Sequence, residues 1–399
     1  MCYTRFAVPW AILLLSLQAP RPNFVIGPDD VLGVQVFRVA ERNRTVGQPN
    51  DNSWKRLLEQ GQRLRAEGRY AEAERAYEAA LAEVNRSSET GLPLATTLNN
   101  LGVLMHSQGR YREAEAQYGV ALMILRKQAG RDEKALAGVL QNYGLLEQAR
   151  GRLPTAERWL DEALRIRVRL LGPVHRESVE TQLALATVWA ESGRKTEAER
   201  TLRELLSAEE KTHGPGELGS VPILKGLGSF YWQQGKNIFA KPFYARAATI
   251  QEETLGRFDS SLAHTLNALG AAHYGLRSYK EAGGCFLRAL EIQQRALGIE
   301  HPEVAMTVHN LAEVQRAQER FDEAERLFQE AIRVWEKTLG PEHLTLAQGL
   351  RNFAALMRRT GRKQEAAQLE RRARLILKRY AADREVQLQR PASRICCIQ

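Results

Sequence analysis

Small residues recur along this chain at a helical spacing that repeats every 42 residues. The first marker is an alanine that would open the second helix of each unit, and it occurs at Ala73, Ala114, Ala156, Ala198, Ala240, Ala282, Ala324 and Ala366. The first interval is 41 residues and each later interval is 42. A glycine marker keeps the same interval at Gly130, Gly172, Gly214, Gly256, Gly298 and Gly340. Two registers that agree without drift predict a tandem array of eight units.

Each unit contains the pattern of two helices. A small residue such as Gly102 stands twelve positions before the marker alanine, and a large apolar residue such as Tyr118 stands four positions after it. An alanine such as Ala121 usually follows at position +7, and positions 0, +4 and +7 lie on one helix face. We therefore expect antiparallel helix pairs that cross at small residues and stack into one continuous core. Glu370 replaces the large apolar residue in the last unit, which predicts an end cap whose outer face meets water.

This order of small, small, aromatic and small residues resembles the tetratricopeptide repeat family. The usual period in that family is about 34 residues. The longer unit here, with linkers such as ALGIEHPEVA (296–305), resembles the kinesin-light-chain subtype over residues 52–375. The resemblance implies an all-α fold, a right-handed superhelical solenoid of about eight helix-turn-helix units, in an array that we place at 52–380. It also implies a scaffold or adaptor that binds proteins.

By the same resemblance, the first helix of each repeat lines a concave groove, and asparagines near its small residue hold the backbone of an extended peptide. Amides suit this task because each offers one donor and one acceptor. The candidate groove residues are Asn100, Asn142, Lys225, Trp232, Asn267, Tyr274, His309, Asn310, Arg316, Arg351, Asn352 and Arg358. The basic members favour acidic ligand groups toward the C-terminal repeats, and Trp232 and Tyr274 would clamp an apolar side chain. The alternative is that these are ordinary solvated residues of a helix face.

Charge is concentrated at the C-terminal end. Residues 351–399 carry thirteen Lys and Arg against four Asp and Glu, which is nearly all of the formal net charge of +10. The array itself is therefore close to neutral, and we expect no nucleic-acid partner. We expect 381–399 to be a basic, disordered tail. An alternative function is a membrane-tethered adaptor, held on anionic lipid by this segment with or without lipidation at Cys396.

The N-terminal end predicts export. Residues 6–17 are an apolar run after Arg5, and Ala19 offers a cleavage position, so we interpret 1–19 as a signal peptide. Residues 20–51 form a strand-like linker segment, and 23–46 resemble the start of the bacterial polysaccharide-export proteins. These features favour an exported, periplasmic or cell-envelope location, with the cytoplasm as the alternative.

Catalytic chemistry is not evident in the sequence. The chain has no H-E-x-x-H, P-loop or G-x-S-x-G motif, and its four cysteines form no metal-binding spacing. We therefore predict a protein that is not an enzyme and has no cofactor or metal. His175, His301 and His343 recur three residues after the linker glycine. We expect them to satisfy backbone groups where the next helix starts.

Overall fold

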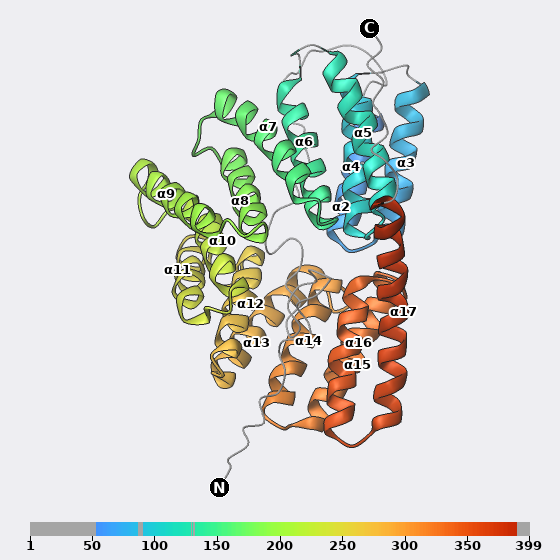
Figure 1. Cartoon of the computed structure of the whole chain (residues 1–399), viewed down its shortest axis with the longest axis vertical. Helices are drawn as coiled ribbons and strands as arrows, with labels where there is room; N and C mark the ends of the chain where they lie inside the picture. The colour runs from blue at the N-terminus through green and yellow to red at the C-terminus, as the bar shows by residue number, and fades with distance from the viewer. Residues whose placement is uncertain (1–52, 87–90, 129, 131, 389–399) are drawn as a thin grey trace.

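The computed structural model describes residues 53–86, 91–128, 130 and 132–388, which form sixteen helices and no strand (Figure 1). The helices are α2 (Ser53–Ala66), α3 (Tyr70–Arg86), α4 (Leu92–Ser107), α5 (Tyr111–Lys127), α6 (Glu133–Ala149), α7 (Leu153–Leu171), α8 (Arg176–Glu191), α9 (Lys195–His213), α10 (Ser220–Gln233), α11 (Asn237–Leu255), α12 (Ser260–Gly275), α13 (Tyr279–Leu297), α14 (Pro302–Ala317), α15 (Phe321–Thr338), α16 (Leu344–Arg359) and α17 (Lys363–Leu388). They pair in order, so that repeat 1 is α2–α3 and repeat 8 is α16–α17. The predicted all-α solenoid of eight helix pairs is confirmed.

The spacing of small residues explains how each pair crosses. In repeat 2, a Cβ atom on Gly102 would lie only 2.7 Å from the Tyr118 ring, so this contact requires a glycine. The marker Ala114 is fully buried in the same core. The turn between the helices contains Gly109 at a φ of 75°, where its N–H donates to the His106 carbonyl and ends α4.

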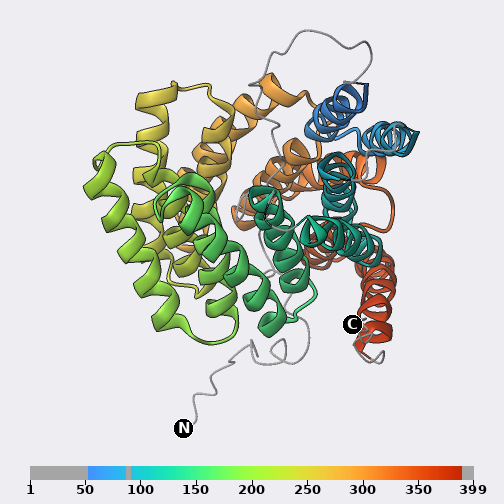
Figure 2. The same cartoon turned by 90° about the horizontal axis from the view of Figure 1, so that it is seen from above.

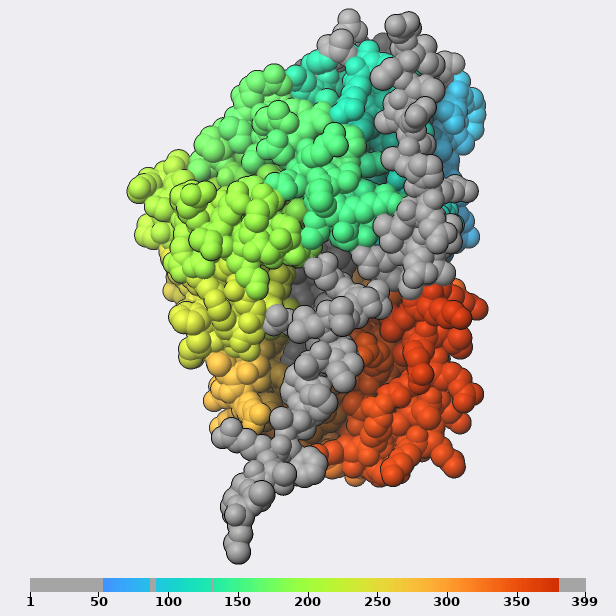
Figure 3. Space-filling view, in the orientation of Figure 1, coloured from blue at the N-terminus to red at the C-terminus, as the bar shows by residue number. Residues whose placement is uncertain are grey.

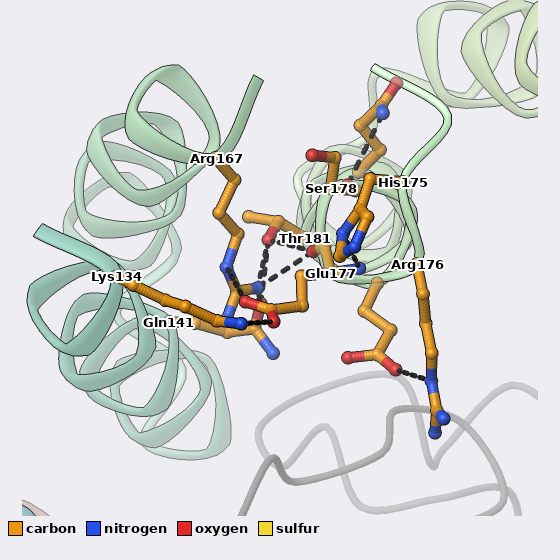
Figure 4. A network of polar contacts seen from close by, with 10 residues as sticks. Lys134, Gln141, Arg167, His175, Arg176, Glu177, Ser178 and Thr181 are labelled. Carbon is orange, nitrogen blue, oxygen red and sulfur yellow. Dashed lines mark hydrogen bonds and ion pairs between the residues drawn. The ribbon is translucent and has the colours of Figure 1, made fainter. Parts of the chain in front are cut away.

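Neighbouring repeats meet at a buried position eleven residues after the marker alanine. In repeat 3 this residue is Arg167, which is 1% exposed and lies between α6, α7 and α8 (Figure 4). Its guanidinium donates to the side chain of Gln141, to Thr181 Oγ1 (2.5 Å) and to the Glu177 carbonyl (2.9 Å). The Glu177 carboxylate lies 3.7 Å away and also pairs with Lys134. This charge is therefore buried with several polar partners.

The same position takes different side chains in later repeats. In repeat 6 it is Gln293, whose Oε1 accepts from Thr307 Oγ1 at 2.5 Å, and this hydroxyl in turn accepts from Asn267 at 2.8 Å. In repeat 7 it is Trp335, whose indole N–H donates to the Pro302 carbonyl at 3.1 Å. The facing residue there is Gly349, where a Cβ atom would lie 2.6 Å from the indole. The stacking geometry is thus kept while its chemistry changes.

The superhelix turns far enough for its ends to meet. The His301 Nε2 atom, before α14, lies 3.1 Å from the Ala66 carbonyl at the end of α2. The His343 Nε2 atom, before α16, lies 3.3 Å from the Ser107 carbonyl at the end of α4. The blue N-terminal repeats and the orange-to-red C-terminal repeats therefore lie on one side of the molecule, and the middle repeats lie on the other (Figures 2 and 3).

The periodic histidines have the predicted structural role. The Nδ1 atoms of His175, His301 and His343 each accept the backbone N–H two residues on, which caps the following helix. Because Nδ1 accepts, the proton of a neutral ring is on Nε2, where His301 and His343 donate it across the closing contact. We call this contact between repeats 7–8 and repeats 1–2 the seam.

The two ends differ in how far the structure describes them. Helix α17 runs to Leu388, so residues 381–388 are helical and not part of the disordered tail that we expected from 381. The exposed Arg371, Arg374 and Leu375 give this last helix the predicted water-facing side. The predicted signal peptide, the strand-like segment and Cys396 lie outside the described residues.

Candidate functional site

The first helices of the repeats form the inner layer of the superhelix. Successive first helices, from α2 and α4 through to α14 and α16, contact one another, whereas successive second helices have no comparable contact in the described part of the chain. In α14, Val308, Leu311 and Ala312 pack into the core, so Asn310 and Glu313 belong to a different face. The candidate residues two and three positions before each small residue therefore follow the inner layer.

Repeats 2 and 3 contribute a group of buried amides to this layer. Asn142 Nδ2 donates to Asn99 Oδ1 at 2.9 Å, which joins two neighbouring first helices. Asn100 Nδ2 donates to the Thr96 carbonyl of its own helix at 2.9 Å, and its Oδ1 accepts from Gln62 at 3.4 Å. Within the described residues, Asn99 Nδ2 and Asn142 Oδ1 are buried without a partner. These two atoms retain unused hydrogen-bonding capacity.

Repeats 6 to 8 form a second polar group. Asn352 Nδ2 donates to His309 Nε2 at 3.0 Å, and its Oδ1 accepts from Gln348 at 3.1 Å. Burial lowers the pKa of His309 to about 3, so its ring is neutral, and the contact with Asn352 leaves the proton on Nδ1. Asn267 Oδ1, Asn310 Oδ1 and His309 Nδ1 are buried with no partner among the described residues.

A buried carboxylate lies at the centre of this second group. Glu313 is 1% exposed, and its Oε2 accepts from Arg316 at 2.6 Å and from the Tyr274 hydroxyl at 3.4 Å. Burial raises the pKa of the Glu313 carboxyl, and the Arg316 guanidinium partly offsets this. Glu313 Oε1 has no partner in the described structure. Glu313 stands one position after the small residue Ala312, outside the positions that we predicted to line the groove.

The basic candidates are not a uniform cationic surface. Arg316 is held by Glu313, and Arg358 forms an ion pair with Glu370. Lys225 and Arg351 are half-buried on α10 and α16. The structure therefore places two of the four cations against glutamates of the same chain.

The two aromatic candidates are already packed. Trp232 is half-buried against the apolar cores of α10 and α12. The Tyr274 ring lies edge-to-face on Tyr279, with centroids 5.3 Å apart, and burial raises the pKa of its hydroxyl. One side of each ring therefore packs against other residues of the chain.

The middle repeats interrupt the polar series with small and apolar residues. Leu183 and Gly226 take the places that hold amides in repeats 2 and 3, and a Cβ atom on Gly226 would lie 2.7 Å from Leu183. A shallow, solvent-open hollow with an enclosed volume of only ≈ 10 Å³ lies here between α8 and α10, with Phe230 and Leu202 in its walls. The inner layer is thus polar, then apolar, then polar along the array.

Metal and membrane features are limited. In the described ranges there is no group of three or more His, Cys, Asp or Glu side chains that could hold a metal ion. Cys285 is a free cysteine, and burial raises its pKa to about 11, which makes it a poor nucleophile. Of the helices described, none is both long enough and apolar enough to cross a bilayer.

Comparisons with known proteins agree with this geometry. The sequence profile described as "Tetratricopeptide repeat" matches residues 57–127, 135–211, 261–337 and 303–379, which together exceed half of the chain. No curated protein matches the sequence.

Three solved structures illustrate the likeness. The putative kinesin light chain TPR-like repeats of Podosopora anserina are 24% identical, with a TM-score of 0.44, and the match covers 54% of this chain and 99% of that one. A Rap protein complexed with competence and sporulation factor is 16% identical, with a TM-score of 0.59 and coverage of 84% and 89%. The apo quorum sensor NprR from B. thuringiensis is 15% identical, with a TM-score of 0.57 and coverage of 81% and 87%. At these identities the likeness concerns the fold.

Proposed function

We propose that this chain, which belongs to the tetratricopeptide repeat family, is a scaffold that holds an extended segment of a protein partner along its inner layer. The observation that carries the proposal is the set of buried polar atoms without partners in that layer. They are Asn99 Nδ2, Asn142 Oδ1, Asn267 Oδ1, Asn310 Oδ1 and Glu313 Oε1. Leaving such a group unpaired costs about 1–3 kcal/mol, and an extended backbone supplies alternating N–H and C=O groups that would pair it.

The polar contacts refine which ligand this layer fits. Because Arg316 and Arg358 are paired with glutamates, the C-terminal repeats attract acidic groups less than the sequence alone suggests. The buried acceptors Asn310 Oδ1 and Glu313 Oε1, which have no partner among the described residues, favour a ligand that donates hydrogen bonds there. The apolar walls between α8 and α10 favour an apolar side chain in the middle of the segment.

The test separates binding from folding. Peptides are selected from a phage-displayed library on the full chain, and their Kd is measured for the wild type and for Asn310→Ala. We expect about tenfold weaker binding, because one hydrogen bond is lost, with unchanged or higher thermal stability, because an unpaired buried acceptor is removed. Asn352→Ala is the matched control, since both ends of that amide are engaged within the fold. Equal affinity of Asn310→Ala and wild type would contradict the proposal.

Helix α17 supports a second candidate function, a membrane-tethered adaptor. Arg372 and Arg379 form ion pairs with Glu336 and Glu342, whereas Arg371, Arg374 and Lys378 are exposed on the outer side. Changing these three outer residues to Gln leaves the buried Ile376 in place. Loss of binding to anionic vesicles at low salt would support the tether, and unchanged binding would refute it.

We also propose a cell-envelope location, supported by the apolar run at 6–17 and the segment 23–46. The N-terminal sequence of the protein recovered from its source cells tests this. A start at or near Pro20 supports export, whereas an intact Met1 contradicts cleavage.

A further inference from the structure

The edge formed by the turns within repeats carries a ladder of ion pairs. The residue after the marker alanine is a glutamate in five repeats. In four of them it pairs with the arginine that precedes the second helix of the next repeat, whereas Glu199 of repeat 4 pairs with Arg203 of its own helix. Glu74 lies 2.6 Å from Arg110, Glu157 lies 2.5 Å from Arg194, and Glu325 lies 2.6 Å from Arg362. The residue before the marker is also a glutamate in six repeats.

Repeat 5 departs from this pattern at both glutamate positions. The Glu-Ala-Glu of 72–74, 113–115, 197–199 and 323–325 becomes Phe239-Ala240-Lys241. Ile238 precedes it, at a position that has no other large apolar residue in the eight repeats. Ile238 is 60% exposed and Phe239 is 56% exposed. The first turn of α11 therefore exposes two large apolar side chains to solvent, at positions where the other repeats have small, polar or charged residues.

The substitutions also remove two lysines from the ladder of close ion pairs. Lys236 takes the place of the arginine that pairs with the first glutamate, as Arg110 does with Glu113 at 2.7 Å. With Phe239 there instead, neither lysine has a close ion pair among the described residues, and Lys236 interacts at longer range with Glu199, whose pKa it helps to lower. In repeat 6, Lys280 occupies the position that Ile238 has in repeat 5, and its side chain is exposed. We call Lys236, Ile238, Phe239 and Lys241 the α11 tip.

Core packing does not account for the α11 tip. One side of Phe239 lies on the Tyr231 ring, with centroids 5.7 Å apart, while the other side is open. Pro242 stands at the sixth residue of α11 and is exposed as well. Repeat 4 builds the same turn with Thr196 and Glu197, so the fold does not need an apolar pair here.

We propose that the α11 tip docks on an anionic lipid surface, with Ile238 and Phe239 entering the interface and Lys236 and Lys241 lying at the headgroups. Two adjacent apolar side chains are far smaller than the ~800 Å² per partner that a stable protein interface buries, but each adds to partition into lipid. A symmetric contact with a second copy would bring like-charged lysines together, which opposes self-association. Taken alone, such a contact is weak and reversible. It uses residues remote in sequence from α17 and does not depend on the peptide-binding proposal.

The test restores the pattern of the other repeats. The full chain is sedimented with vesicles of phosphatidylcholine containing about 30% phosphatidylglycerol, and with phosphatidylcholine alone, over a salt series. We expect the wild type to bind the anionic vesicles and the double variant Ile238→Thr/Phe239→Glu, which copies repeat 4, to bind about tenfold less. Leu287→Glu is the matched control because Leu287 is 59% exposed on the neighbouring α13 and should not affect binding.

Each outcome decides the proposal. A selective loss in the double variant supports it, and retained circular dichroism and melting temperature show that the loss is not unfolding. Equal binding of wild type and double variant overturns it, as does absence of wild-type binding to anionic vesicles at low salt. A dimer in sedimentation velocity that the double variant converts to monomer also overturns it, since the occupant is then a second copy.

Discussion

The junction between repeats 3 and 4 and the junction between repeats 7 and 8 solve one packing problem with opposite chemistry. At the first, the buried Arg167 reaches Gln141 and Thr181 through hydrogen bonds. At the second, Trp335 fills the equivalent space and the facing residue is reduced to Gly349. Repeats 5 and 6 lie between these extremes, with Gln251 and Gln293 each bonded to a threonine. The space between neighbouring repeats is similar at each junction, and each junction fills it with its own pair of residues.

Two junctions with the same spacing in the sequence can therefore be held together by different interactions. An arginine junction stabilises only if its partners remain, because a buried charge without them is costly. A tryptophan junction depends on close packing and on one hydrogen bond, from its indole to the Pro302 carbonyl.

Trp335→Ala should lower the free energy of unfolding by about 3–5 kcal/mol, because it empties a fully buried site. Urea denaturation of the full chain measures it. A loss below about 1 kcal/mol would mean that repeat 8 collapses into the space and that the junction is not rigid.

Arg167→Ala should cost about 3 kcal/mol, since it leaves Gln141, Thr181 and Glu177 without their shared partner. Arg167→Gln copies repeats 5 and 6 and should cost much less, because it can still bond Thr181. The same denaturation assay compares the two variants. If they lose equal stability, the hydrogen-bond network is not what holds this junction.

Gly349→Ala should cost about 1–3 kcal/mol, because its Cβ would overlap the Trp335 ring. Trp335→Gln with Gly349→Thr reproduces the glutamine–threonine junction of repeat 6. In a double-mutant cycle we expect the pair to be more stable than the sum of the single changes predicts. Additive losses would show that the two positions are not coupled.

His301→Ala should cost about 1 kcal/mol more than His175→Ala, because both remove a helix cap but only His301 also reaches Ala66 across the seam. Burial lowers the pKa of His301 and of His343. The unfolded chain therefore binds more protons as pH falls below about 6.5, and stability should fall with it. Thermal melts from pH 7.5 to 5 measure this, and a flat profile would contradict it.

Much of the fold could be predicted from the sequence, because it depends on local periodicity. The alanine and glycine markers located all eight helix pairs, and Gly102 and Tyr118 indicated the close crossing that the structure has. The histidine caps also followed from their place before each helix. These features repeat within 42 residues and need no knowledge of the superhelical path.

The candidate site was less predictable because it depends on pairing between repeats. Asn142 forms a hydrogen bond with Asn99, and Asn352 forms one with His309, so residues at different positions of neighbouring repeats meet. The residues at one repeat position, compared across the eight repeats, do not predict these pairings. Glu313 and the Phe239-Ala240-Lys241 departure were visible in the sequence, at positions that only a comparison of all repeat positions would have examined. The groove residues themselves remain a prediction.

The seam has a consequence for how such a chain can evolve. A solenoid with open ends tolerates gain or loss of a unit, because each unit touches only its neighbours. Here α14 meets the end of α2 and α16 meets the end of α4, six units further on in each case. Deleting one internal unit would bring the wrong helix start to Gly68, whose lack of a Cβ atom admits Pro302. Because the two ends of the array meet, the number of repeats is fixed, as the number of subunits is in a closed ring.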